Sequence, residues 1–184
     1  MRIIAGQHRG TALVPVGAGD DAAHLRPTTD RVRESLFNVL QGGRFGDPIQ
    51  GALVLDLFAG TGALGLEALS RGATHATFVD DGKVAQGLIA GNIAKLRRAG
   101  DCTLLRCRAD ALPDGKPCGL VFLDPPYGLG LGLTALRTAR AKGWIAAGTV
   151  IVWEERTAQI PPQGFKALDA RRYGDTWITL VEAL

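Results

Sequence analysis

The chain has 184 residues, of which 46% are hydrophobic and 21% are charged. This length supports one hydrophobic core of ordinary size, and this composition excludes a disordered or fibrous protein. The first residues lack the apolar run of a secretory signal, and no stretch reaches the ~18 uncharged apolar residues that a membrane span requires. We therefore expect a compact cytoplasmic protein.

Cysteines, histidines and net charge set further limits. The three cysteines are odd in number and too widely spaced for a CxxC pair, so free thiols are expected rather than disulfides or a zinc site. The three histidines are scattered without ligand spacing, which also argues against a metal. A net charge of +3 permits a polyanionic partner such as a nucleic acid without requiring one.

The first 50 residues are predicted to form an amino-terminal extension. Residues 2–5 and 11–16 alternate like two short strands. Residues 30–40 follow with the apolar spacing of a helix, for which Thr28 or Thr29 is the expected N-cap. The sequence shows no linker that would free this extension, so we expect it to pack on a main domain formed by residues 51–184.

From about residue 53, short apolar runs alternate with helical patterns, as in βα units around a mostly parallel sheet. Strands are expected at residues 53–58, 76–80, 103–107, 120–124 and 149–153, and helices at residues 63–71, 83–98 and 133–142, the second of these stopping at Gly100. Residues 165–173 and 176–182, around a turn at Gly174-Asp175, are typical of an antiparallel hairpin. The expected fold is α/β, a Rossmann-like sheet of seven strands with this hairpin at its end.

A glycine turn follows the first strand. Gly60, Gly62 and Gly65 let the backbone pass close to a ligand, and the helix that begins there offers unpaired N–H groups. This spacing matches the dinucleotide fingerprint, and Asp80 stands about 20 residues further on, where an acid binds ribose hydroxyls. Asp56 before the turn instead favours a cofactor with cationic sulfonium and ammonium groups, because it would repel a pyrophosphate.

The second motif is Asp124-Pro125-Pro126-Tyr127, at the end of an apolar strand. Ligands of open α/β sheets bind at the carboxyl ends of the strands, so Asp124 is expected in one cleft with the glycine turn. A carboxylate and a rigidly held carbonyl can accept both hydrogens of an exocyclic base amine and turn its lone pair toward a methyl donor. Tyr127 offers a flat face for a base that has left its stack.

With these motifs the chain resembles the RsmD family of small-subunit (16S) ribosomal RNA guanine-N2 methyltransferases. Besides Asp-Pro-Pro-Tyr, the likeness is carried by residues 2–6 with Arg9-Gly10, by residues 26–38 and by residues 55–73. Residues 26–38 discriminate best, because the other motifs occur in many amino-methyltransferases. The resemblance implies methyl transfer from S-adenosylmethionine (SAM) to N2 of an extracted guanine, with S-adenosylhomocysteine as product. It also implies a monomer that acts on 16S ribosomal RNA within a small-subunit ribonucleoprotein.

The resemblance further assigns roles to individual residues. The base would be held by Asp124, Pro125, Pro126 and Tyr127. The cofactor would be bound by Asp56, Phe58, Gly60, Gly62, Asp80 and Asp110, with Thr29 and Arg33 helping to close its site. Apart from the resemblance, RNA contacts are expected from basic side chains around the mouth of the cleft. The candidates are Arg2, Arg9, Arg26 and Arg31 in the extension, and further Lys95, Arg97, Arg98, Arg171 and Arg172. An aspartate stands at position 80 where a longer glutamate is expected, so Asp81 is an alternative ribose ligand.

Three alternatives stay open on the sequence alone. An adenine-N6 methyltransferase needs the same two acceptors, and only the amino-terminal segment argues against it. An NAD-binding oxidoreductase fits the literal glycine spacing together with Asp80. A catalytically silent RNA-binding or assembly protein would keep the fold without turnover.

Overall fold

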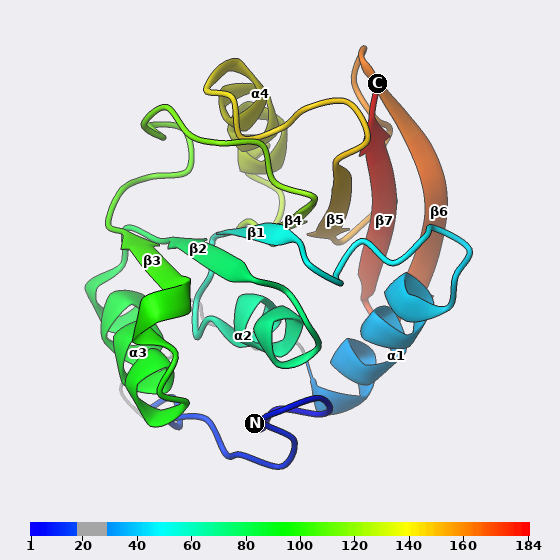
Figure 1. Ribbon diagram of the computed structural model, residues 1–184. Coiled ribbons are helices and arrows are strands. Elements are labelled where there is room, and N and C mark those ends of the chain that lie inside the picture. The colour runs from blue at the N-terminus through cyan, green and yellow to red at the C-terminus, as the bar shows by residue number, and fades with distance from the viewer. Residues whose placement is uncertain (18–28) are drawn as a thin grey trace.

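A computed structural model describes residues 1–17 and 29–184, which include a seven-stranded sheet (Figure 1). The strands are β1 (Leu53–Leu57), β2 (His75–Val79), β3 (Cys102–Leu105), β4 (Leu120–Leu123), β5 (Val150–Glu155), β6 (Phe165–Tyr173) and β7 (Thr176–Ala183). They lie in the order β3-β2-β1-β4-β5-β7-β6. The first five are parallel, and β7 is antiparallel to both β5 and β6. The predicted Rossmann-like fold with a terminal hairpin is confirmed.

Helices cover both faces of the sheet (Figure 1). They are α1 (Asp30–Gln41), α2 (Ala63–Ser70), α3 (Lys83–Lys95) and α4 (Leu131–Ala141). Alternate strand residues point to opposite faces, so Val54 joins the core under α1, α2 and α3, whereas Leu55 joins the core under α4. Burial on both faces explains why the parallel strands are continuous apolar runs. No helix in the described part of the chain is long and apolar enough to cross a bilayer.

The amino-terminal extension pairs with itself in an antiparallel way, as predicted, but over a shorter stretch than the two expected strands. Arg2 and Ala12 make one isolated bridge. Backbone hydrogen bonds join residues 1–3 to residues 10–13 around this bridge. The N–H groups of Ile4 and Ala5 instead bond to the carboxylate of Glu67 in α2, at 2.8 and 3.0 Å. The N–H of Ala5 would be the next donor in the pairing, so its bond to Glu67 keeps the pairing short.

One predicted helix end is confirmed, and another differs from the prediction. Thr29 is the N-cap of α1, with its hydroxyl accepting the N–H of Val32 at 3.4 Å, and Thr28 lies outside the described residues. The helix α3 ends at Lys95, three residues early, because Arg97 adopts a left-handed conformation with φ +55°. A short 3₁₀ helix, Ala99–Asp101, then leads into β3. The other boundaries of the main domain agree with the expected ones to within two residues.

Candidate active site

The carboxyl ends of the parallel strands bring the two predicted motifs together. β1 pairs with β4 so that Leu57 lies opposite Leu123. The following residue, Asp124, donates its backbone N–H to the carbonyl of Leu57 at 3.5 Å. The negative charge of Asp56 is also close enough to raise the pKa of the Asp124 carboxyl. The glycine turn after β1 therefore begins beside the Asp-Pro-Pro-Tyr segment.

The glycine turn is built on left-handed backbone. Gly60 and Gly62 have φ values of +56° and +74°, and Phe58, which has a side chain, has φ +59°. Such a conformation is strained for a residue with a Cβ, and strain of this kind collects at functional sites. Gly62 is the N-cap of α2 and brings no capping side chain. This edge thus offers backbone that a ligand can approach closely.

Asp56 links β1 to α2. Its side chain is buried, and Oδ2 accepts the backbone N–H of Gly65 at 2.9 Å. Burial raises the pKa of Asp56 to about 8, with a smaller rise from the charge of Asp80 and an opposing effect of the Gly65 bond. Position 65 has no room for a side chain, because a Cβ would lie 2.5 Å from the ring of Phe78. A cofactor contact by Asp56 remains a prediction.

Asp80 joins the glycine turn to the loop after β2. Its two carboxylate oxygens accept the N–H groups of Gly60 and Gly82, each at 2.9 Å. Burial is the main cause that raises its pKa. Each carboxylate oxygen can accept a second bond, so these contacts leave capacity for ribose hydroxyls. Asp81, the alternative ribose ligand, is exposed, and the choice between the two acids remains a prediction.

Asp110, one of the predicted cofactor-binding residues, forms an ion pair with Arg108. The guanidinium donates to both oxygens of Asp110, at 2.8 and 2.5 Å, and this bonding lowers the pKa of the carboxyl. The pair lies in the loop after β3, the neighbour of β2. Thr29 is placed as the cap of α1. Cofactor contacts by Asp110 and Thr29 remain predictions.

Arg33 is fully buried under the amino-terminal extension. Its Nη2 donates to Asp30 at 2.8 Å and to the carbonyl of Arg2, and its Nε lies 3.9 Å from the carboxylate of Glu67. Burial lowers the pKa of this guanidinium. These contacts join α1, α2 and the extension, while a contact with the cofactor remains a prediction. Glu67 was missed in the sequence, because nothing local marks a helical glutamate as buried.

Four acids gather around the edge of the sheet at Asp124. The register of β4 and β5 pairs Leu123 with Trp153, which puts Glu154 next to Asp124. Burial is the main cause that raises the pKa of Asp124 well above its usual value, followed by the charges of Glu154, Asp56 and Glu155. The carboxyl of Asp124 therefore holds a proton more tightly than that of an ordinary aspartate.

Tyr127 is held at its hydroxyl by two neighbouring strands. The hydroxyl donates to Oε1 of Glu154 at 2.8 Å and lies 3.1 Å from Oγ1 of Thr176, the first residue of β7. Burial raises the pKa of Tyr127, so the phenol keeps its proton. The guanidinium of Arg156 lies 6.0 Å from the centre of the ring. Of the two prolines between Asp124 and Tyr127, the first is buried and the second is exposed.

Glu154, Glu155 and Thr176 were missed in the sequence. A signal existed for the two glutamates, since they follow an apolar run just as Asp124 follows β4. The rule that parallel strands end at one cleft applies to both runs. Thr176 carried no such signal, because it reaches this edge only through the antiparallel course of β7.

The arginines predicted to contact RNA lie mainly on the extension. Arg2, Arg9 and Arg31 are exposed, and Arg2 lies 3.6 Å from Asp30. Arg26 falls outside the described residues. RNA contacts by these side chains, and by the further basic candidates, remain predictions.

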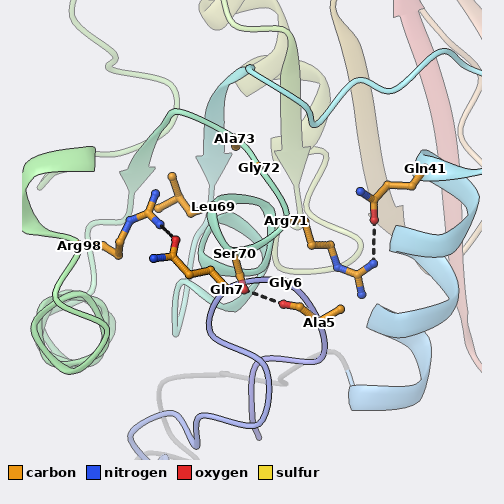
Figure 2. Close-up of a pocket in the computed structure, with 10 residues that line it drawn as sticks. All are labelled: Ala5, Gly6, Gln7, Gln41, Leu69, Ser70, Arg71, Gly72, Ala73 and Arg98. Carbon is orange, nitrogen blue, oxygen red and sulfur yellow. Dashed lines mark hydrogen bonds between the residues drawn. The ribbon is translucent and has the colours of Figure 1, made fainter.

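A hollow of about 450 Å³ lies at the carboxyl end of α2, at the opposite end of that helix from the glycine turn (Figure 2). Two arginines take part in its wall. Arg71 bonds to Glu67 at 2.7 Å, and Arg98 forms an ion pair with Asp101 at 2.7 Å. The wall consists of Ala5, Gly6, Gln7, Gln41, Leu69, Ser70, Arg71, Gly72, Ala73 and Arg98. This hollow arises where the extension packs on α2, and it is separate from the candidate site.

Known proteins match the chain along nearly its whole length. Residues 1–182 match the family described as Conserved hypothetical protein 95. The protein named Ribosomal RNA small subunit methyltransferase D in Escherichia coli is 45% identical over 157 residues, which cover 84% of this chain and 74% of that protein. The chain belongs to the RsmD family. The resemblance predicted from the sequence is thus confirmed.

Two further comparisons extend this RsmD assignment. A Haemophilus influenzae protein, also named Ribosomal RNA small subunit methyltransferase D, is 33% identical over 181 residues, or 95% of this chain and 89% of that protein. The solved structure of the Escherichia coli protein yhhF matches with a TM-score of 0.84 and 36% identity, over 100% of this chain and 97% of that one. The chain therefore shares the fold of the yhhF structure over nearly the whole of both chains.

Proposed function

We propose that this RsmD chain is a SAM-dependent methyltransferase that methylates the exocyclic N2 of a guanine in small-subunit ribosomal RNA. The observation that carries the proposal is the position of Asp124, at the carboxyl end of β4 beside the glycine turn that follows β1. The names of two relatives supply the substrate class, ribosomal RNA of the small subunit. The choice of guanine N2 rests on the sequence resemblance.

The residues around the glycine turn fit SAM by their chemistry. Gly60 and Gly62 expose backbone beside the N-terminus of α2, and the carboxylate of Asp80 has acceptor capacity for ribose hydroxyls. The acids Asp56 and Asp124 suit a ligand with cationic groups better than a pyrophosphate. When bound, SAM supplies a methyl group on a cationic sulfur and leaves as neutral S-adenosylhomocysteine.

The reaction that we propose uses two acceptors of the chain. The carboxylate of Asp124 and the carbonyl of Pro125 accept the two N–H hydrogens of the base amine, which directs the nitrogen lone pair toward the methyl group. The nitrogen–carbon bond forms as the sulfur–carbon bond breaks, and the amine then loses one proton. A carboxylate whose pKa is raised is a suitable acceptor for that proton. Tyr127 supports the ring of the extracted base.

Label from tritiated SAM tests this proposal. The purified chain is incubated with small-subunit ribosomal RNA, and separately with small subunits, from cells that lack the modification, and the RNA is digested to nucleosides. We expect label in N2-methylguanosine. Label in N6-methyladenosine would show the wrong base, and binding of either substrate without any transfer would favour an assembly protein. Binding of NADH without binding of SAM would favour an oxidoreductase.

A further inference from the structure

The hydroxyl of Tyr127 donates a hydrogen bond to the carboxylate of Glu154. Both residues lie at the edge of the sheet where we propose that the guanine amine is methylated. Glu154 lies in β5 next to Asp124 and accepts this hydroxyl at 2.8 Å, while Thr176 of β7 lies 3.1 Å from the hydroxyl. Two strands thus hold the far end of one aromatic ring. A tyrosine side chain has two main torsions, and bonds at its far end restrict both.

Glu154 occupies a costly position for a residue with only a packing role. Its side chain is 8% exposed and lies beside Asp124, whose pKa it raises by like charge. Burying a carboxylate next to another acid is unfavourable unless specific bonds compensate. The short bond from Tyr127 is such a compensation. The hydrogen bond between Glu154 and Tyr127 therefore fits a role in orienting the ring of Tyr127.

We propose that Glu154 is a positioning residue for methyl transfer. It fixes the ring of Tyr127 as the platform on which the target guanine rests, and Thr176 is the second anchor. This inference rests on the proposed function, since it needs a base beside Asp124. A fixed platform keeps the amine aligned with the methyl group, and loss of alignment lowers the rate even where binding persists.

A double-mutant cycle tests this role. The variants are Tyr127→Phe, Glu154→Ala, the double variant, and Glu154→Gln, whose amide oxygen can still accept the hydroxyl. Tyr173→Phe is the matched control, because Tyr173 also bonds through its hydroxyl, to Ser35 at 3.1 Å. Single-turnover methyl transfer is measured at saturating SAM over a range of pH, so that a change in the pKa of Asp124 is separated from a change in the maximal rate. The melting temperature and the SAM dissociation constant are measured in parallel.

We expect Tyr127→Phe and Glu154→Ala each to lower the transfer rate about tenfold, the size of one lost charge-assisted hydrogen bond, with unchanged SAM affinity. The double variant should be no slower than Tyr127→Phe, because that single variant already removes the bond to Glu154. Glu154→Gln should restore most of the rate, and Tyr173→Phe should match the wild type.

Two different failures are separable in this design. Multiplying effects in the double variant, or a Glu154→Gln variant as slow as Glu154→Ala, would overturn the role of Glu154 while the wild type still transfers methyl groups. A wild type that transfers no methyl group to any ribosomal RNA would overturn the proposed function itself.

Discussion

The buried carboxyl of Asp56 accepts the backbone N–H of Gly65 at 2.9 Å, which ties the end of β1 to the first turn of α2. This bond closes the base of the glycine turn. It also keeps an acid where burial raises its pKa to about 8. The turn is therefore stabilised by a group whose protonation state changes near neutral pH.

Stability is predicted to fall with rising pH through Asp56. The unfolded carboxyl ionises near pH 4 and the folded one near pH 8, so unfolding between these values releases a proton and becomes easier as the pH rises. Linkage gives an upper bound of about 5 kcal/mol for this change. In Asp56→Asn the amide oxygen can still accept the N–H of Gly65, but the side chain no longer titrates. Denaturant unfolding from about pH 5 to about pH 9 should show a flatter curve for the variant, and parallel curves would refute the assignment.

Gly6 is predicted to resist substitution. It has φ +78°, and a Cβ there would lie 1.8 Å from the carbonyl oxygen of Ser70, which also accepts the N–H of Gln7. Gly6→Ala should cost more than about 3 kcal/mol of unfolding free energy, because the extension must leave α2. Gly10 is the matched control: it has φ +83° but open space around it, so Gly10→Ala should cost only about 1 kcal/mol. Equal costs in denaturant unfolding would contradict the close contact.

Glu67 is predicted to be the main link between α2 and the extension. Its buried carboxylate accepts two backbone N–H groups of the extension and the guanidinium of Arg71. Glu67→Ala should lower the free energy of unfolding by about 3 to 5 kcal/mol, since it leaves the buried N–H donors without an acceptor. Asp114→Ala, which breaks an exposed ion pair with Lys142, should change it by less than about 1 kcal/mol. A Glu67 effect as small as this control would be inconsistent with the network.

The pH profile of methyl transfer is predicted to report Asp124. Only the ionised carboxylate can accept both an N–H and a proton, so kcat/KM should fall as the pH drops through the pKa of Asp124. Burial and the charges of Glu154, Asp56 and Glu155 raise that pKa, which puts the acid limb above the usual aspartate range. Glu154→Gln removes one of these charges and should move the limb to lower pH. An unmoved limb would show that another group controls it.

The sheet could be predicted from the sequence because each of its signals is local. The run Leu120–Leu123 is buried on both faces, so it shows as an unbroken apolar stretch, and the turn at Gly174-Asp175 marks the hairpin. The position of Asp124 in one cleft with the glycine turn could be predicted from the rule that ligands bind at the carboxyl ends of parallel strands. Both predictions depended on residues close together in the chain.

The remaining features depend on contacts between distant residues. Arg33 is a charged residue at a helix position that the sequence pattern leaves exposed. It is nevertheless fully buried, because Glu67 and the extension surround it. The pairing in the extension is shorter than predicted for the same reason, since the distant Glu67 accepts the N–H of Ala5 that would continue it. Thr176 reaches Tyr127 only through strand order. Local patterns carry no information on such partners.

The most direct test asks whether Asp124 acts on the base and not on the cofactor. Asp124→Ala removes the acceptor for the base amine but leaves the glycine turn and Asp80 in place. Calorimetric titration with SAM and single-turnover transfer to ribosomal RNA are measured on the same preparation. We predict transfer at least about a hundredfold slower than in the wild type, with SAM affinity changed by no more than a few-fold. Transfer at the wild-type rate, or a loss of SAM binding as large as the loss of transfer, would contradict the account.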